Sequence, residues 1–198
     1  MGRFSDSFGD KLLPGMYSMP IHAIPKPNSN DFRLVTNQSV GAHLLNSMIK
    51  REDITGYPLD NMTHLGEMLM RKKNEFPGER LVLFKSDIAE AYRLLPVHPL
   101  WQIKEINTIR GLHHVDRRNC FGGKASGSLF IAVNVLITWI TKNECGISDL
   151  ATYCDDSFAV ELMSNFTFYA PYNRNLPSAQ ASLLSLWDQL GVPHKEKK

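Results

Sequence analysis

The hydrophobic positions of this chain fall into short runs separated by turn residues. Leu150–Tyr153 and Phe158–Val160 flank two adjacent acids, Asp155 and Asp156, a pattern that predicts a hairpin with two carboxylates at its tip. On its own such a pair is typical of a solvated turn, because aspartate tolerates turn geometry and bonds its own backbone. The role of these acids therefore depends on what the rest of the chain places beside them.

A nearly continuous apolar run at residues 80–87 predicts a second kind of strand, buried on both faces and central in its sheet. This run ends on Asp87, and an acid at the end of a buried strand either faces a cleft or costs stability. Further along, Trp101–Ile109 and Leu112–Val115 predict another hairpin.

A basic hairpin is expected earlier in the chain. Residues 19–25 and Phe32–Thr36 are joined by a turn-rich segment, and two prolines restrict this ribbon to the edge of a sheet. Lys26 and Arg33 lie near its loop. Taken alone they are typical of solvated charge, and only a phosphate ligand would give them a further role.

Three helices complete the pattern. The first follows Pro58 with Asp60 or Asn61 as its cap, and residues 129–143 predict a helix inside the molecule, because they are apolar on almost all faces. The last runs over residues 177–190, and the aromatic segment before it, residues 164–177, predicts a loop. The apolar stripe of the first helix, typical of a core face, comprises Leu59, Met62, Leu65, Met68 and Leu69.

Composition adds little to this picture. The 198 residues hold 22 Lys and Arg against 20 Asp and Glu, a net charge of +2, so bulk charge neither indicates nor excludes a nucleic-acid partner. The three cysteines are odd in number and far apart, which favours reduced thiols. No signal peptide or membrane segment is expected, and we expect an intracellular protein of the cytoplasm or nucleus.

The acids acquire a chemical meaning together. If the strand that ends on Asp87 pairs with the Asp155–Asp156 hairpin, three carboxylates meet, and they repel one another unless a cation neutralises them. Carboxylate oxygens suit Mg²⁺, and two such ions clamp the attacking and leaving oxygens in phosphoryl transfer. We expect two Mg²⁺ ions, with Mn²⁺ as the alternative.

Five segments in order then resemble the fingers and palm of reverse transcriptases encoded by retroelements. Tyr153–Asp156 (YCDD) matches the family's Tyr-x-Asp-Asp signature, and Lys85–Pro99 is similar to the first palm motif, an Asp with an aromatic five residues later. Phe121–Phe130 resembles the second motif, Pro25–Ser39 the basic fingers segment, and Leu190–Lys198 the Leu-Gly-x motif with its lysine. The resemblance covers the chain from about Tyr17 onward.

The resemblance implies an α+β right-hand polymerase fold with an antiparallel palm sheet packed on helices. Residues 17–80 and part of 100–120 would be fingers, and residues 81–99 and 121–198 palm, after a loose lead-in at 1–16. Family members continue into a thumb and often an RNase H domain, so we expect a fingers–palm region without its thumb.

The resemblance also implies roles for individual residues. Asp87, Asp155 and Asp156 would be the catalytic acids and metal ligands, with Asp87 and Asp155 the stronger candidates for the metal. Tyr92 would be the steric gate that excludes a 2′-hydroxyl. Residues that would contact the incoming nucleotide are Lys26, Arg33, Tyr92, Phe121, Gly122, Gly123 and Lys197, and Tyr153 and Cys154 complete the signature.

The function that follows is RNA-directed DNA polymerisation, in which dNTPs are added to a primer on an RNA or DNA template. The alternative is a non-catalytic palm remnant that binds nucleic acid or a protein partner. A metal-dependent nuclease ranks below both, because it shares the acids but has no use for Tyr92 or the basic hairpin.

Overall fold

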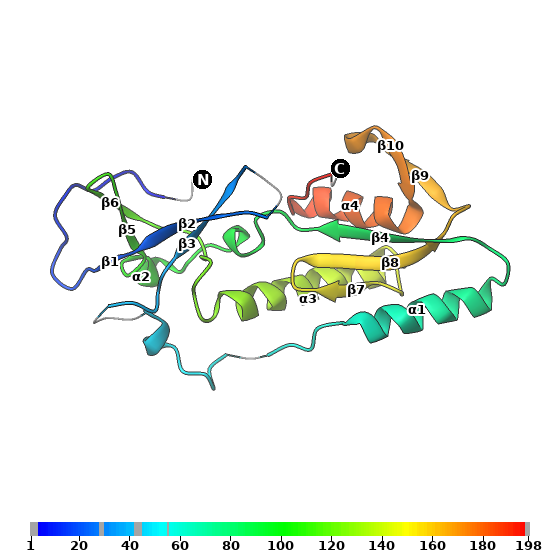
Figure 1. The fold of residues 1–198 in the computed structure, drawn as a ribbon, viewed down its shortest axis with the longest axis horizontal. Helices are drawn as coiled ribbons and strands as arrows, with labels where there is room; N and C mark the ends of the chain where they lie inside the picture. Colours follow the sequence, from blue (N-terminus) through cyan, green and yellow to red (C-terminus); the bar gives the residue numbers. More distant parts are fainter. Residues whose placement is uncertain (1–3, 28–29, 42–44, 55, 197–198) are drawn as a thin grey trace. The chain divides into compact units, whose positions relative to one another are not determined.

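The computed structural model of the chain describes residues 4–27, 30–41, 45–54 and 56–196. It divides into two compact units, each built from two stretches of sequence (Figure 1). The first unit comprises Met1–Gly56 and Tyr92–Phe130, and the second comprises Tyr57–Ala91 and Ile131–Lys198. The predicted boundaries of fingers and palm stay a prediction.

The first unit contains a two-stranded and a three-stranded sheet. Strands β2 (Ile21–Pro25) and β3 (Phe32–Thr36) form the predicted basic hairpin, with Ile24 opposite Arg33. In the other sheet, β5 lies between β1 and β6, parallel to β1 and antiparallel to β6. Its strands are β1 (Ser18–Met19), β5 (Ile106–Ile109) and β6 (Leu112–Val115).

The segment before β5 differs from the sequence prediction. Instead of a strand from Trp101, residues Pro99–Gln102 form the short helix α2. Proline at the first helical position and the ring of His98, whose Nδ1 accepts from the Leu100 N–H at 3.2 Å, start a helical turn there. In the described part of the chain, short 3₁₀ helices are formed by Leu45–Met48, Ala91–Leu94 and Ala170–Tyr172.

Residues 5–8 lie along β6. The Ser5 N–H donates to the Val115 carbonyl at 2.9 Å and the Phe8 N–H to the His113 carbonyl at 3.1 Å. The ring of His114 bonds the Ser5 carbonyl at 3.1 Å as well. Ser5 and Phe8 thus make backbone contacts with β6, while the predicted lead-in at residues 1–16 stays a prediction.

The second unit is organised around an antiparallel sheet in the order β4-β8-β7 (Figure 1). Strand β8 (Asp156–Leu162) pairs over its whole length with β4 (Leu81–Asp87) and forms the predicted acidic hairpin with β7 (Ala151–Tyr153). Helix α1 (Met62–Glu75) begins after Asn61, which caps it as predicted.

The position of β4 was predicted wrongly. Within the described residues β4 pairs with β8 alone, so it is an edge strand and β8 is the central one. Side chains alternate along it: Phe84 and Ser86 are buried, whereas Leu83 is 56% exposed. The apolar run therefore predicted too much burial. Periodicity cannot distinguish a fully buried central strand from a half-buried edge strand that carries apolar residues on both faces.

Helix α3 (Ser126–Glu144) is also less buried than its composition predicts. Phe130, Ile137 and Thr141 are buried on one face, while Leu136 and Trp139 are 57% and 59% exposed on the other. The stripe of the first predicted helix is likewise reduced, since Met68 is buried against β8 but Met62 is 75% exposed. None of the described helices has the length and apolar character that crossing a bilayer requires.

The aromatic segment after β8 is ordered rather than a loop. It forms an antiparallel hairpin, β9 (Phe166–Tyr169) and β10 (Arg174–Pro177), followed by helix α4 (Ser178–Leu190). Tyr169 is buried, and its Oη donates to Asp188 of α4 at 2.6 Å. Burial of Trp187, which is fully inaccessible, anchors α4 in this unit.

Candidate active site

Three acids from two strands converge in the second unit. Antiparallel pairing places Asp87, the last residue of β4, opposite Asp156, the first residue of β8. Asp155 lies in the adjoining turn, and one ligand oxygen from each of the three carboxylates lies within 4.8 Å of the others. All three side chains are half-buried. The sheet register thus brings together acids that are far apart in the sequence.

The turn that presents Asp155 has two residues, Cys154 and Asp155, and is held from both sides. The Ile88 N–H donates to the Asp155 carbonyl at 2.9 Å, and the side-chain amide of Asn134 on α3 donates to the Cys154 carbonyl at 2.7 Å. Cys154 has φ +53°, a conformation that non-glycine residues adopt rarely and at some cost. Supporting contacts of this kind keep a strained turn in one conformation.

Lys85 supplies a positive charge beside the acids. It lies two residues before Asp87 on β4, and its Nζ pairs with the carboxylate of Asp156. This pairing offsets part of the repulsion among three neighbouring carboxylates. Burial, followed by the charges of Asp155 and Asp156, raises the pKa of the Cys154 thiol, so this cysteine stays protonated at neutral pH.

Asn134 and Lys85 were not singled out from the sequence. Asn134 was visible as the one amide inside an otherwise apolar helical run, a signal that a buried polar group needs a partner. Lys85 had no comparable signal, because its pairing with Asp156 depends on the register of β4 and β8.

A second group of predicted residues meets in the first unit. The ring of Phe121 contacts two of them: the centroid of the Tyr92 ring is 4.9 Å away, and the guanidinium of Arg33 lies 5.0 Å from the centroid of Phe121. Tyr92 also contacts Phe130 edge-on at 5.6 Å. Arg33, Phe121 and Tyr92, here called the aromatic cluster, therefore form one continuous set of contacts.

The other predicted nucleotide contacts differ in their surroundings. Lys26 lies at the end of the β2–β3 hairpin, with its Nζ 3.8 Å from the carboxylate of Asp31. Gly122 packs against β3, because a Cβ on it would lie 2.0 Å from the carbonyl oxygen of Thr36. Lys197 lies outside the described residues.

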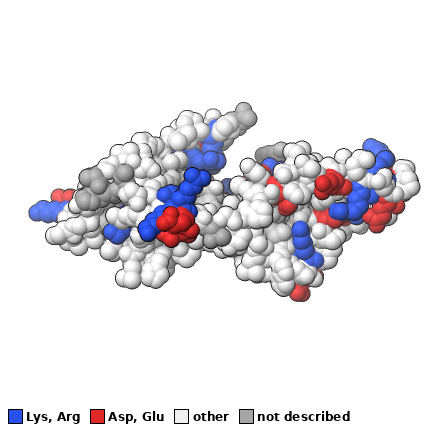
Figure 2. All heavy atoms as spheres, turned by 90° about the horizontal axis from the view of Figure 1, so that it is seen from below, with Lys and Arg blue, Asp and Glu red and all other residues white. Residues whose placement is uncertain are grey.

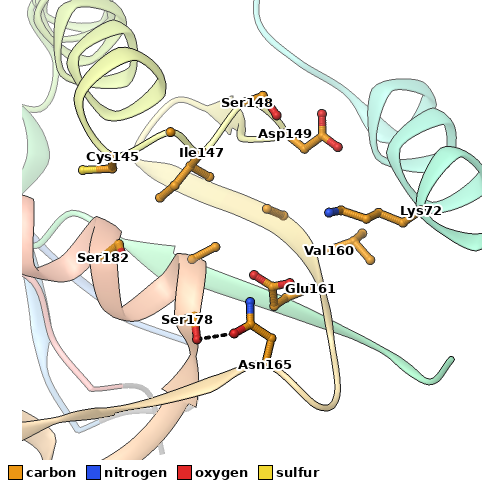
Figure 3. A pocket seen from close by; sticks show the side chains of 13 residues that line it. Lys72, Cys145, Ile147, Ser148, Asp149, Val160, Glu161, Asn165, Ser178 and Ser182 are labelled. Carbon is orange, nitrogen blue, oxygen red and sulfur yellow. Dashed lines mark hydrogen bonds between the residues drawn. The ribbon is translucent and has the colours of Figure 1, made fainter. Parts of the chain in front are cut away.

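A separate pocket of about 250 Å³ opens in the second unit (Figure 3). Lys72 from α1 and Glu161 from β8 line it, together with Asn165 and the hydroxyls of α4. Ser178 donates to Asn165 Oδ1 at 2.8 Å, so part of the polar lining is already paired. None of the three acids lines this pocket, and we assign it no role in the candidate site.

Charge is mixed on the face drawn in Figure 2. Lysine and arginine side chains are interspersed there with aspartate and glutamate, and much of the face is uncharged. This distribution agrees with the net charge of +2. Electrostatics on this face would act through local groups rather than through a broad basic surface.

No protein-family model and no curated protein sequence matches the chain. Solved structures do: a foamy viral protease-reverse transcriptase dRH in complex with double-stranded DNA has a TM-score of 0.58 at 18% identity, over 89% of this chain and 25% of that one. The prototype foamy virus protease-reverse transcriptase CSH mutant has a TM-score of 0.58 at 15% identity, over 98% and 21%.

A third structure, the foamy viral protease-reverse transcriptase with an RNA/DNA hybrid, has a TM-score of 0.54 at 18% identity, over 87% of this chain and 19% of that one. This chain thus spans about a fifth to a quarter of the length of these three proteins. At such low identity the likeness concerns the fold. The chain has a reverse transcriptase-like fold.

Proposed function

We propose that this chain is the fingers and palm of a retroelement RNA-directed DNA polymerase. The observation that carries the proposal is the convergence of Asp87, Asp155 and Asp156, with one ligand oxygen from each within 4.8 Å of the others. Their order in the chain and the Tyr-x-Asp-Asp turn agree with the motifs of that enzyme class. The reverse transcriptase-like fold supports the same assignment.

The acid cluster fits a divalent metal centre. Carboxylate oxygens are the ligands that Mg²⁺ and Mn²⁺ prefer, and half-buried acids so close together are stabilised by a cation. Asp87 and Asp155 would be the principal ligands, as the motifs of that enzyme class imply, and Lys85 pairs with Asp156. Two bound ions would stabilise charge on the attacking and leaving oxygens of phosphoryl transfer.

The aromatic cluster is the proposed nucleotide site. Arg33 would bind the triphosphate, since its guanidinium offers a fork of donors to phosphate oxygens. Tyr92 would pack against the sugar and exclude a 2′-hydroxyl, while Phe121 and Gly122 border the nucleotide. The contacts of Phe121 with both Tyr92 and Arg33 support this grouping, because they hold the two side chains to one ring.

Template and primer are the proposed macromolecular partners. Two of the similar structures were solved with double-stranded DNA and with an RNA/DNA hybrid, which supports a duplex ligand here. Affinity for such a ligand comes mainly from phosphate contacts, so a thumb or RNase H domain, fused or separate, would strengthen it.

Primer extension tests the proposal. On RNA and DNA templates with Mg²⁺ or Mn²⁺, the chain should add dNTPs to a primer. Asp155→Asn should lower the rate by about 10²–10³-fold or more, because it removes a charge that acts in the transition state. The matched control is Asp53→Asn, an equal charge change at an exposed position of the first unit, which should keep full activity.

The pattern of results separates the alternatives. Equal rates for wild type and Asp155→Asn would remove the acids from catalysis. A folded chain that binds template and primer but does not extend them under either metal would instead support the non-catalytic remnant.

A further inference from the structure

A buried polar network adjoins the aromatic cluster. The side-chain amide of Gln38, just beyond β3, donates to both carboxylate oxygens of Glu105, at 2.7 and 2.8 Å, and contacts the sulfur of Cys120 at 3.0 Å. Each of these three side chains is at most 4% exposed. Cys120 directly precedes Phe121, so the network reaches the backbone next to the Phe121 ring.

The same network reaches the residue next to Tyr92. The Asp116 N–H donates to the Glu105 carbonyl at 2.6 Å, and the buried carboxylate of Asp116 accepts from Arg93 at 2.7 Å. Arg93 also donates to the carbonyl of Arg118 at 3.1 Å. Both aromatic rings of the proposed nucleotide site are thus one residue away from this network.

The segment Cys120–Gly123 has little room to move. The Phe121 carbonyl accepts from the Thr36 N–H at 3.0 Å, and Gly122 approaches Thr36 so closely that no side chain fits. On Gly123 a Cβ would lie 3.2 Å from Oε1 of Gln38. Gln38 therefore links this segment, through Cys120, to Glu105.

An apolar core would hold this region together at lower cost. A buried carboxylate loses its hydration, and a neutral amide donor replaces only part of it. Fully bonded polar groups, however, fix one geometry, because a shifted arrangement leaves a donor or acceptor without a partner. We therefore expect the network to fix the position of the segment rather than to stabilise the fold.

We propose that Gln38 and Glu105 are positioning residues of the nucleotide site, whose buried hydrogen bonds fix Cys120–Gly123 and thereby the ring of Phe121. This inference rests on the proposed function, since it concerns affinity for the incoming nucleotide. It assigns no chemical step to either residue.

The surroundings of Glu105 add a pH signature. Its pKa is raised to about 7, chiefly by burial; the bond from Gln38 acts to lower this pKa, and the charge of neighbouring Asp116 acts to raise it. The Trp101 hydrogen bond and the charge of Arg93 lower it less. The ionised carboxylate accepts two bonds from Gln38, so nucleotide affinity should change between about pH 6 and pH 8.

The test compares the wild type with Gln38→Leu/Glu105→Leu, which replaces the pair with apolar side chains of similar size. Such exchanges often preserve or raise stability, so denaturant unfolding should show no loss. Binding of dTTP to the chain on a dideoxy-terminated primer and RNA template, with Mg²⁺, should weaken about 10-fold or more. Exchange of the Thr36 amide hydrogen should become faster, because its acceptor is Phe121.

Two further variants complete the design. Glu105→Gln keeps the shape and should bind dTTP with no change from pH 6 to pH 8. Ser18→Ala/Thr108→Val removes two other side-chain hydrogen bonds of the first unit, Ser18–Thr108 at 2.6 Å and Thr108–His113 at 2.9 Å, and should leave dTTP affinity and Thr36 exchange unchanged.

The outcomes distinguish this inference from the proposed function. If the wild type does not bind dTTP in that complex, the proposed function fails and the inference falls with it. If the wild type binds and the double leucine variant binds equally well, the inference alone is overturned, whatever happens to Thr36 exchange. If the double leucine variant loses affinity but also unfolds early, Glu105→Gln decides. A dTTP affinity that changes with pH in Glu105→Gln as much as in the wild type would also overturn the inference.

Discussion

Gly122 occupies a place where a side chain has no room. Its φ is +116°, and a Cβ would lie 2.0 Å from the carbonyl oxygen of Thr36 at the end of β3. Close backbone packing within the first unit therefore accounts for a glycine at this position. Any role of Gly122 beside a nucleotide comes in addition to that packing.

Gly122→Ala should lower the free energy of unfolding by about 2–4 kcal/mol, since it adds both strain and overlap with a backbone oxygen. Gly127→Ala is the matched control: its Cβ would lie an ordinary 3.7 Å from the Tyr92 hydroxyl, within α3. There alanine should leave the free energy of unfolding unchanged or raise it by up to about 1 kcal/mol. Equal denaturation midpoints for the two variants would contradict this explanation.

Glu105 should make stability depend on pH. Its pKa rises from 4.5 to about 7 in the folded chain, so the folded state keeps a proton that the unfolded state loses. The contribution of Glu105 to the free energy of unfolding is therefore fully present below about pH 4.5. It is lost as the pH rises through 7, which lowers stability by on the order of 3 kcal/mol.

Urea unfolding from pH 4.5 to 7.5 measures this dependence. Glu105→Gln should flatten the profile, whereas Glu52→Gln, at an exposed position of the same unit, should keep the wild-type slope. A Glu105→Gln profile as steep as that of the wild type would show that Glu105 is not the titrating group.

At the scale of elements, the acidic hairpin depends on α3. Asn134 is buried and bonds the Cys154 carbonyl, which ties the turn to the helix. In Asn134→Leu this bond is lost, and the free energy of opening the turn should fall by about 1–2 kcal/mol. The turn should then be open about 5–30 times more often. Hydrogen exchange of the Ile88 amide, which bonds Asp155, reports this opening.

The matched control lies on the same helix. Asn143 donates to the Trp139 carbonyl one turn earlier, at an exposed position away from the hairpin. Asn143→Leu should leave exchange of the Ile88 amide unchanged. Equally slow exchange in Asn134→Leu would mean that the turn holds its conformation without α3.

Local signals predicted the elements better than their environment. The β2–β3 and β7–β8 hairpins and the capped start of α1 follow from turn residues, alternation and a capping asparagine, all short-range. The edge position of β4 and the exposed face of α3 depend on which elements pack beside them. No periodicity within one element contains that information.

At the scale of the whole molecule, the predicted site residues divide between the two units. The acids belong to the second unit and the aromatic cluster to the first. Motif order predicted both groups, whereas the network of Gln38, Glu105 and Cys120 was missed. Its members are 67 and 82 residues apart in sequence and share no motif, so only the fold brings them together.

The central claim is that Asp87, Asp155 and Asp156 form a divalent metal centre, and a Mn²⁺ titration followed by electron paramagnetic resonance tests it most directly. The wild type should bind Mn²⁺ in competition with Mg²⁺. Asp155→Asn should weaken binding about 10-fold or more, a loss of about 1.4 kcal/mol, and Asp53→Asn should leave it unchanged. Equal Mn²⁺ affinity in wild type and Asp155→Asn would contradict the claim.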